Sequence, residues 1–320
     1  MREVPSTGAG HVPVMVEEVM QALAPRPGSL QIDGTLGGGG HAARILEAIS
    51  PDGRLLGLDA DAHAIERSAR RLAPYGDHAQ LRHANFSAVG AVAAEAGFDP
   101  ADGILLDLGL SSDQLADATR GFSFRADGPL DMRFDPTRGT PASELVATLD
   151  EVELAALFRR FGEEPFAVRI ARAIVAERRV EPIDTARRLA QVVERAAPGR
   201  VSGRRRVHPA TRIFQALRIA VNSELEALEV ALTAAVGLLR PGGRIVVLTY
   251  HSLEDRIVKR FIAAERRGCT CPPELPICVC GRRARLRIVP GTPATPTTDE
   301  IAANPRARSA RLRAAERLAA

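Results

Sequence analysis

The sequence contains no tryptophan, only two tyrosines and a single lysine, and no apolar run of the length that a membrane-spanning helix requires. It also begins without the apolar stretch of a secretion signal, so we expect a protein that is not exported. All four cysteines lie between residues 269 and 280, which leaves none elsewhere for the disulfide framework of a secreted fold. These absences predict a cytoplasmic protein in a reducing compartment, with no membrane partner.

Charge is distributed unevenly along the chain, although the 320 residues have the 45% hydrophobic and 26% charged content of an ordinary globular protein. Residues 156–218 carry 15 arginines against 6 acids, and residues 256–320 carry 14 basic side chains against 5 acids. Two basic segments in an otherwise acidic chain favour a polyanionic partner such as RNA or DNA. Solvated helix faces would give the same pattern.

Short apolar segments alternate with helical patterns over the first 110 residues, which predicts βαβ units and a parallel sheet. The alternation stops after Gly109 and resumes with a long helix expected over 210–239. Between them lie a loop rich in glycine, aspartate and proline, 120–141, and three helical patterns, with no convincing strand. This length and pattern predict an α/β domain interrupted by a helical insertion. The predicted strands are 30–33, 54–59, 80–83, 103–107, 244–249 and 285–289.

Glycines follow the first predicted strand in the run Gly37–Gly40. Glycine lets a ligand approach the backbone closely, because no Cβ intervenes and positive φ is allowed. The spacing of Gly37, Gly39 and Ala42 also fits the dinucleotide-binding pattern, which keeps a nicotinamide-dependent oxidoreductase as an alternative. A tight turn without any ligand would use the same glycines.

Acidic residues end three of the predicted strands, at Asp33, Asp59 and Asp107. Asp33 would repel a pyrophosphate but suits a cationic or zwitterionic ligand, and Asp59 can accept hydrogen bonds from ribose hydroxyls. This pair of acids is the arrangement expected for S-adenosylmethionine. Because the carboxyl ends of parallel strands meet at one crevice, we expect all three carboxylates to converge there. A divalent metal is the alternative, although the spacing suits a longer ligand.

Eight blocks of sequence resemble, in the same order, the bacterial small-subunit ribosomal RNA cytosine-N4 methyltransferase family known as RsmH or MraW. The resemblance covers nearly the whole chain, from about His11 to Arg317, and is far more specific than a lone glycine loop. The blocks are Ile32–His41, Asp102–Ser112, Arg120–Arg133, Pro136–Arg138, His208–Arg212, Val221–Leu225, His251–Lys259 and Asn304–Ser309.

The resemblance implies an α/β fold with a class I (Rossmann-like) methyltransferase sheet and a helical insertion domain. We expect residues 1–112 and 208–320 to form a discontinuous methyltransferase domain, and residues 113–207 to form an insertion that recognises RNA. The implied methyl donor is S-adenosyl-L-methionine, and the implied acceptor is a cytosine in the decoding region of 16S rRNA in the small ribosomal subunit. An assembly factor that binds RNA and uses the cofactor pocket only structurally is the non-enzymatic alternative.

Cofactor contacts carry over from the family to seven residues of this chain. Among them, Phe86 follows a predicted strand, where its ring could pack on the adenine. The full set is Gly39, Gly40, His41, Asp59, Phe86, Asp107 and Gln114.

The catalytic group stays open at this point. Cytosine N4 is a poor nucleophile, and an acceptor hydrogen-bonded to its N–H would orient the amine and stabilise the positive charge that develops on it. Many amino-methyltransferases supply that acceptor in an Asp/Asn/Ser-Pro-Pro-aromatic motif, whereas the matching place here reads Asp107-Leu-Gly-Leu-Ser-Ser. Phe122 or Phe124 could stack the exposed base. The candidate catalytic residues are Asp107, Ser111, Ser112 and His251.

The cysteines form a local cluster of two C-x-C pairs, Cys269, Cys271, Cys278 and Cys280. Four nearby thiolates can surround a zinc ion, although C-x-C is a less typical spacing than C-x₂-C. Reduced thiols in a loop are the alternative, and we assign no metal to the predicted active site. The arginines that follow in residues 306–313 either contact phosphate or lie on the acidic body of the protein.

Overall fold

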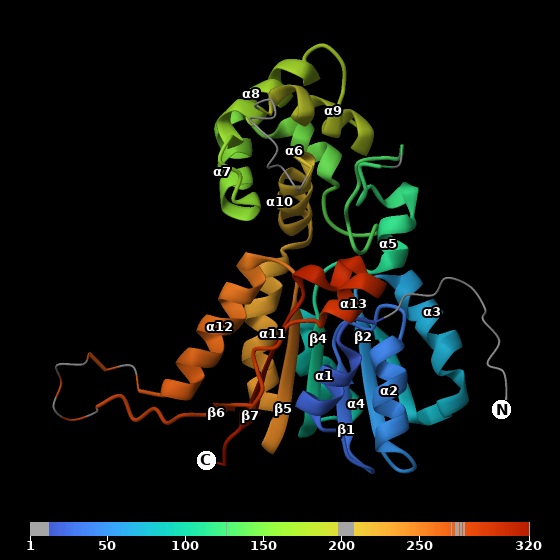
Figure 1. The fold of residues 1–320 in the computed structure, drawn as a ribbon, viewed down its shortest axis with the longest axis vertical. Coiled ribbons are helices and arrows are strands. Elements are labelled where there is room, and N and C mark those ends of the chain that lie inside the picture. Colours follow the sequence, from blue (N-terminus) through green and yellow to red (C-terminus); the bar gives the residue numbers. More distant parts are fainter. Residues whose placement is uncertain are drawn as a thin grey trace. The chain divides into compact units, whose positions relative to one another are not determined.

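The computed structural model describes residues 13–125, 127–197, 208–269, 271–272, 275, 277 and 279–319. The described residues form two compact units (Figure 1). One, which we call the sheet unit, comes from the described parts of 1–109 and 225–320, and the other, the helical unit, from those of 110–224. Among the described residues, no helix combines the length and apolar character that crossing a membrane requires. The arginine run 204–206, part of the basic segment 156–218 that is predicted to meet a polyanion, lies outside them.

The sheet unit is built around a seven-stranded sheet in the order β3-β2-β1-β4-β5-β7-β6. The first five of these strands run parallel, and β7 is antiparallel to both β5 and β6. The predicted α/β class and parallel sheet are therefore confirmed. The chain order reverses between β1 and β4, which is where doubly wound sheets bind ligands beyond their carboxyl ends. The strands are β1 (Leu30–Asp33), β2 (Arg54–Asp59), β3 (Ala79–His83), β4 (Ala101–Asp107), β5 (Leu239–Thr249), β6 (Leu286–Ile288) and β7 (Arg311–Arg317).

Helices cover both faces of the sheet, because successive apolar residues of a strand point to opposite faces and each face must be buried. In β4, Ile104 and Leu106 belong to one buried cluster and Leu105 to the other. The first cluster includes α4 (Val89–Ala96), α11 (Glu224–Leu238) and α12 (Ser252–Arg267), and the second includes α1 (Val16–Leu23), α2 (Gly40–Ile49) and α3 (Ala62–Leu72). Short helices complete the unit: η1 (Ala73–His78), η2 (Phe86–Ala88), α13 (Thr298–Ala303) and η4 (Pro305–Ser309).

Two features of the sheet differ from the sequence prediction. β5 starts at Leu239, and its pairing with β4 is irregular, since Ala101 pairs with Leu239 while Gly103 already pairs with Arg244. The sequence pattern does not predict β7, which inserts the basic segment 311–317 between β5 and β6. Arg313 and Arg311 form ion pairs of 2.7 and 3.5 Å with Asp255 of α12, so this segment lies on the body of the sheet unit.

The helical unit contains no β-strand in its described residues, as predicted; a single β-bridge joins Pro129 to Thr185. α7 packs against α8 and α10, and α9 packs against α8 and α10. The approach of α7 to α10 requires Gly162, because a Cβ there would lie 2.7 Å from the carbonyl oxygen of Arg212. The helices are α5 (Ser112–Ala116), η3 (Ala118–Arg120), α6 (Ala142–Thr148), α7 (Glu151–Gly162), α8 (Ala167–Arg178), α9 (Ala186–Ala196) and α10 (Ala210–Asn222).

The long helix expected over 210–239 is two helices. Ser223 adopts a φ of 49°, in the left-handed region, and separates α10 from α11. Because α10 packs on α7 and α9, the compact units divide near Gly109 and Glu224, whereas the predicted domains divide at 112 and 207. The role of the insertion in RNA recognition stays a prediction.

Candidate functional site

Three carboxylates end neighbouring strands of the sheet. β2, β1 and β4 lie side by side, and their last residues are Asp59, Asp33 and Asp107. β5 lies next to β4, with Asp107 paired to Leu248, so Tyr250 follows at the same edge. The three acids therefore lie at the same edge of the sheet, and a tyrosine that follows a fourth strand lies there with them.

The loop between β1 and α2 is tied to both neighbouring strands. The hydroxyl oxygen of Thr35 accepts a hydrogen bond of 2.6 Å from the backbone N–H of Asp107. Gly37 has a φ of 54°, and a Cβ at this position would meet nothing closer than the Thr35 carbonyl at 3.8 Å. Gly39, with a φ of 71°, is the N-cap of α2. The loop is thus fixed at its base, while the space beside Gly37 stays open.

Asp59 holds this loop through its carboxylate. Its two oxygens each accept a backbone hydrogen bond of 2.8 Å, one from Gly37 and one from Asp61. Loss of hydration raises the pKa of Asp59 to about 6, although these two hydrogen bonds act against the rise. Each carboxylate oxygen has a second lone pair, so Asp59 can still accept hydrogen bonds from a ligand.

Asp33 is buried, with 1% of its surface exposed. Burial raises the pKa of Asp33 to about 7, while the nearby His41 and the hydrogen bond from the Thr35 N–H lower it in part. The carboxyl group is therefore poised between its two forms near neutral pH. A cationic group bound beside it would favour the ionised form.

Asp107 lies between His41 and Tyr250. The Tyr250 hydroxyl donates a hydrogen bond of 2.8 Å to Oδ1 of Asp107, and Nε2 of His41 lies 3.5 Å from Oδ2. Burial, the negative charge of Asp107 and this hydrogen bond raise the pKa of Tyr250 well above its usual value, so the phenol stays protonated and donates. Burial opposes protonation of His41, but its approach to Asp107 and the charge of Asp33 outweigh this and raise its pKa.

These residues fit a cationic ligand that carries hydroxyl groups. At Asp33 the loss of hydration outweighs the charge of the nearby His41, so a further cationic group would stabilise the carboxylate. Nδ1 of His41, which is 6% exposed, has no hydrogen-bond partner among the described residues, whereas Nε2 faces Oδ2 of Asp107 at 3.5 Å. Buried polar groups are normally paired, so the Nδ1 atom indicates that a ligand completes the site. S-adenosylmethionine, with its ammonium, sulfonium and ribose groups, has this chemistry.

The model of the MraW methylase family matches residues 8–318. This chain belongs to that family. Curated relatives named ribosomal RNA small subunit methyltransferase H include one from Thermomicrobium roseum, 55% identical over 97% of this chain and 94% of the relative. One from Geotalea uraniireducens is 52% identical over 96% of this chain and 98% of the relative. One from Geobacter sulfurreducens is 54% identical over 96% of this chain and 99% of the relative. Membership confirms the methyltransferase class and S-adenosylmethionine as methyl donor.

The remaining predicted cofactor residues of this MraW methylase lie in both units. Phe86 follows β3 and is partly buried against the sheet, with its Cβ 3.4 Å from the place of a Cβ on Gly34. Gly40 opens α2, where a Cβ would lie 2.8 Å from the ring of Pro13. Gln114 belongs to the helical unit, where it forms a capping box with Ser111 at the start of α5. The cofactor roles of these residues stay predictions.

The other candidate catalytic residues of the methylase have local structural tasks. Oγ of Ser111 accepts the N–H of Gln114, and the Gln114 side chain accepts the N–H of Ser111. Ser112 is the first residue of α5. His251 caps α12, with Nδ1 accepting the N–H of the buried Glu254 at 3.4 Å. Helix capping accounts for the residue types at Ser111 and His251. The catalytic roles of Ser111, Ser112 and His251 stay predictions.

The two candidate stacking residues are part of aromatic groups in the helical unit. Phe122 is buried and stacks on Phe134, with 5.7 Å between ring centroids. Phe124 is half-buried and stacks on His208 at 4.4 Å, with the edge of Phe214 at 5.2 Å. Both rings already have partners, and stacking on an RNA base stays a prediction.

A pocket of about 430 Å³ opens beside the end of β5 in the sheet unit of the methylase. Tyr250 and His251 line it, together with the basic residues Arg256, Lys259 and Arg311 and the acid Asp255, which pairs with Arg311. The pocket therefore has an excess of positive charge next to the residue that donates to Asp107. A polyanion could bind there.

Tyr250 is a residue of this site that sequence reasoning missed. It directly precedes the predicted candidate His251, and it directly follows an apolar strand. The available signal was its position at the carboxyl end of β5, which the doubly wound order places next to β4 and Asp107.

Proposed function

We propose that this chain is a cytoplasmic enzyme that transfers a methyl group from S-adenosylmethionine to N4 of a cytosine in the decoding region of 16S rRNA. The observation that carries the proposal is the group of Asp33, Asp59 and Asp107 around an open glycine loop, in a chain of the MraW methylase family. The curated relatives are named for methylation of small-subunit rRNA, which supports RNA as the substrate class.

The first two acids bind the cofactor in this proposal. When bound, S-adenosylmethionine supplies an electrophilic methyl group on a sulfonium. Asp33 is buried and has a pKa near neutral pH. It pairs with the ammonium group of the methionine part, and this positive charge favours the ionised form of Asp33. Asp59, fixed by two backbone hydrogen bonds, accepts from the ribose hydroxyls. Phe86 packs on the adenine.

Asp107 acts on the acceptor amine. Its carboxylate is fixed by Tyr250 on Oδ1 and flanked by His41 near Oδ2, so little reorganisation is needed when charge develops nearby. A carboxylate that accepts the N4–H of cytosine orients the amine and stabilises the positive charge on it. The proton of N4 then leaves by way of this hydrogen bond.

RNA binds in part through the basic pocket beside β5. Lys259 is exposed on α12, and Arg311 is half exposed at the start of β7. Phosphates of a single-stranded segment would pair with these side chains and bring the flanking base toward Asp107. The helical unit contributes further RNA contacts.

The test is methyl transfer from S-adenosylmethionine with a labelled methyl group to two substrates: naked 16S rRNA and small subunits from cells that lack the modification. Digestion to nucleosides and mass spectrometry then identify the product. We expect N4-methylcytidine from at least one of the substrates, mapped to the decoding region by fragment analysis.

Calorimetry with S-adenosylmethionine alone separates cofactor binding from transfer. Binding without methylation of either substrate would contradict the enzymatic proposal and favour the assembly factor. Label in a base other than cytosine, on cytosine C5 or on a ribose would contradict the assigned acceptor.

A further inference from the structure

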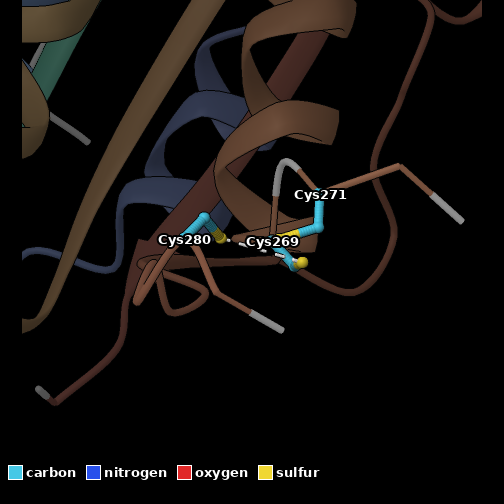
Figure 2. Close-up of side chains that lie close together, drawn as sticks. All are labelled: Cys269, Cys271 and Cys280. Carbon is cyan, nitrogen blue, oxygen red and sulfur yellow. Dashed lines mark hydrogen bonds between the residues drawn. The ribbon is translucent and has the colours of Figure 1, made fainter. Parts of the chain in front are cut away.

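Three cysteine sulfurs lie close together, outside the site described above. The Sγ atoms of Cys269, Cys271 and Cys280 all lie within 4.8 Å of one another (Figure 2). The distance between Cys269 and Cys280 is 3.8 Å. All three side chains are half-buried. The fourth cysteine, Cys278, lies outside the described residues.

The base of this cysteine loop is closed by contacts that bring its two limbs together. The backbone N–H of Arg285 donates to the carbonyl of Glu265, and the Arg285 side chain forms an ion pair of 2.5 Å with the Glu265 carboxylate. Gly268 follows α12 with a φ of 70°, and a Cβ there would lie 2.3 Å from the N of Ala284. Cys269 and Cys271 lie on the limb of the loop that follows α12, and Cys280 lies on the limb that leads back to Arg285.

The loop beyond its base exposes apolar side chains. Ile277 is 75% exposed and Val279 is 77% exposed, so these described residues form no apolar core. A segment without a core needs another source of order, and a metal crosslink supplies one in many small loops.

The geometry matches a zinc–thiolate site. Zinc binds thiolate sulfur at about 2.3 Å, and tetrahedral angles then place the sulfurs about 3.8 Å apart. A disulfide would join only two of the sulfurs, whereas three meet here. Zinc with three thiolates has a net negative charge, and the segments that flank the cysteines are basic, with Arg266, Arg267, Arg282 and Arg283.

We propose that Cys269, Cys271 and Cys280 bind a zinc ion that fixes the loop after α12. Each thiol loses its proton to solvent as its sulfur–zinc bond forms, and the ion undergoes no redox change. The role is structural, since zinc crosslinks the two limbs of the loop that the Glu265–Arg285 pair closes. This proposal does not depend on the methyltransferase activity.

The first experiment measures metal content. The full chain, produced without a polyhistidine tag in zinc-supplemented cells and desalted under reducing conditions, is analysed by mass spectrometry for zinc, iron and copper. We expect about one zinc per chain. The double variant Cys269→Ser with Cys280→Ser should hold at least roughly tenfold less, because both limbs then lose a thiolate. Val279→Ser, exposed in the same loop, is the matched control and should keep the zinc.

A second experiment needs no variant. Cobalt(II) added to the metal-stripped wild-type chain should give thiolate-to-cobalt charge-transfer absorption and visible bands of tetrahedral cobalt, which zinc then abolishes. Three outcomes would each overturn the proposal. They are cobalt spectra without thiolate charge-transfer bands, an equal zinc content in the double variant and the wild type, and iron or copper bound in place of zinc. A disulfide between Cys269 and Cys280, found in protein whose free thiols were alkylated during cell lysis, would also overturn it.

Limited trypsin digestion shows whether the ion fixes the loop. Arg266, Arg267, Arg282 and Arg283 flank the cysteines and provide cleavage sites. Chelation should accelerate cleavage at these arginines in the wild type and in Val279→Ser, but have no effect in the double cysteine variant. Equal cleavage of the wild type with and without chelator would contradict a structural role for the metal.

Discussion

The Tyr250 hydroxyl donates a 2.8 Å hydrogen bond to Oδ1 of Asp107, joining the residue after β5 to the last residue of β4. Because burial and the charge of Asp107 raise the pKa of Tyr250 well above its usual value, the phenol stays a donor throughout the neutral range. The carboxylate proposed to act on the acceptor amine is thus held by a group that touches neither substrate in the proposal. Tyr250 is a positioning residue.

Tyr250→Phe tests this relationship. We expect methyl transfer to fall about 10- to 100-fold, because hydrogen bonds to charged groups contribute about 1.5–3 kcal/mol. Turnover and S-adenosylmethionine affinity are measured together, with thermal unfolding as a check on the fold. Tyr75→Phe is the matched control, since the Tyr75 hydroxyl makes only a 3.4 Å contact with the Ala43 carbonyl. An equal loss in both variants would argue against a specific role for Tyr250.

Asp107→Asn keeps the size of the side chain but removes its charge. We expect turnover to fall about 10²–10³-fold, the cost of losing one group that stabilises charge in the transition state. If Tyr250 acts through Asp107, adding Tyr250→Phe should cost little more, which a double-mutant cycle measures. A rate loss matched by an equal loss of cofactor affinity would make Asp107 a binding residue alone.

Asp59→Ala should weaken S-adenosylmethionine binding by about 1–3 kcal/mol, because ribose hydroxyls lose their charged acceptor and two backbone N–H groups lose theirs. Isothermal calorimetry measures the change. Asp52→Ala, at an exposed acid, serves as the control and should leave affinity unchanged. Unchanged affinity in Asp59→Ala would remove Asp59 from the cofactor site.

The raised pKa of Asp33 predicts a pH dependence of folding stability. The unfolded chain ionises this group from its ordinary pKa of 3.8 upward, whereas the folded protein holds the proton until about pH 7. The folded state binds more protons in this window, so the free energy of unfolding falls as pH rises from about 4 to 7. Asp33→Asn should flatten this fall in denaturant titrations at pH 5 and pH 8. An unchanged slope would contradict the raised pKa.

Lys259→Gln should flatten the salt dependence of RNA binding. If Lys259 contacts one phosphate of a single strand, the slope of log K against log salt should fall by about 0.7. Filter binding of a 16S rRNA fragment at several salt concentrations measures this slope. Arg26→Gln removes an equal charge just before β1, at the amino ends of the strands, and should leave the slope unchanged.

Much of the sheet unit is predictable because its sequence is locally consistent. Apolar runs such as Leu55–Leu58 and Ile104–Leu106 are too short for helices and end in acids or glycines, so strands and loop positions follow directly. The cofactor class is predictable because glycines leave room for a ligand at the backbone and the acids at the strand ends suit its cationic and hydroxyl groups.

β7 and Tyr250 depend instead on tertiary neighbours. β7 has small Ala314 and Ala315 at its centre, which give a weak hydrophobic signal, and its arginines favour a solvated tail until Asp255 pairs with them. The break at Ser223 carries neither glycine nor proline, so the local pattern continues through it. The Tyr250–Asp107 bond joins residues 143 positions apart, and only the sheet order brings them together.

The position of β7 also sets an order of assembly. β6 precedes β7 in the chain, yet it reaches the sheet only through β7, which pairs with β5 on its other edge. β6 therefore gains its strand pairing only once the strand after it has docked, whereas the cysteine loop is already joined to α12 through Arg285 and Glu265. The edge of β5 next to Thr249 stays open during synthesis, available to any other extended segment, until Arg311–Arg317 has formed and closed it.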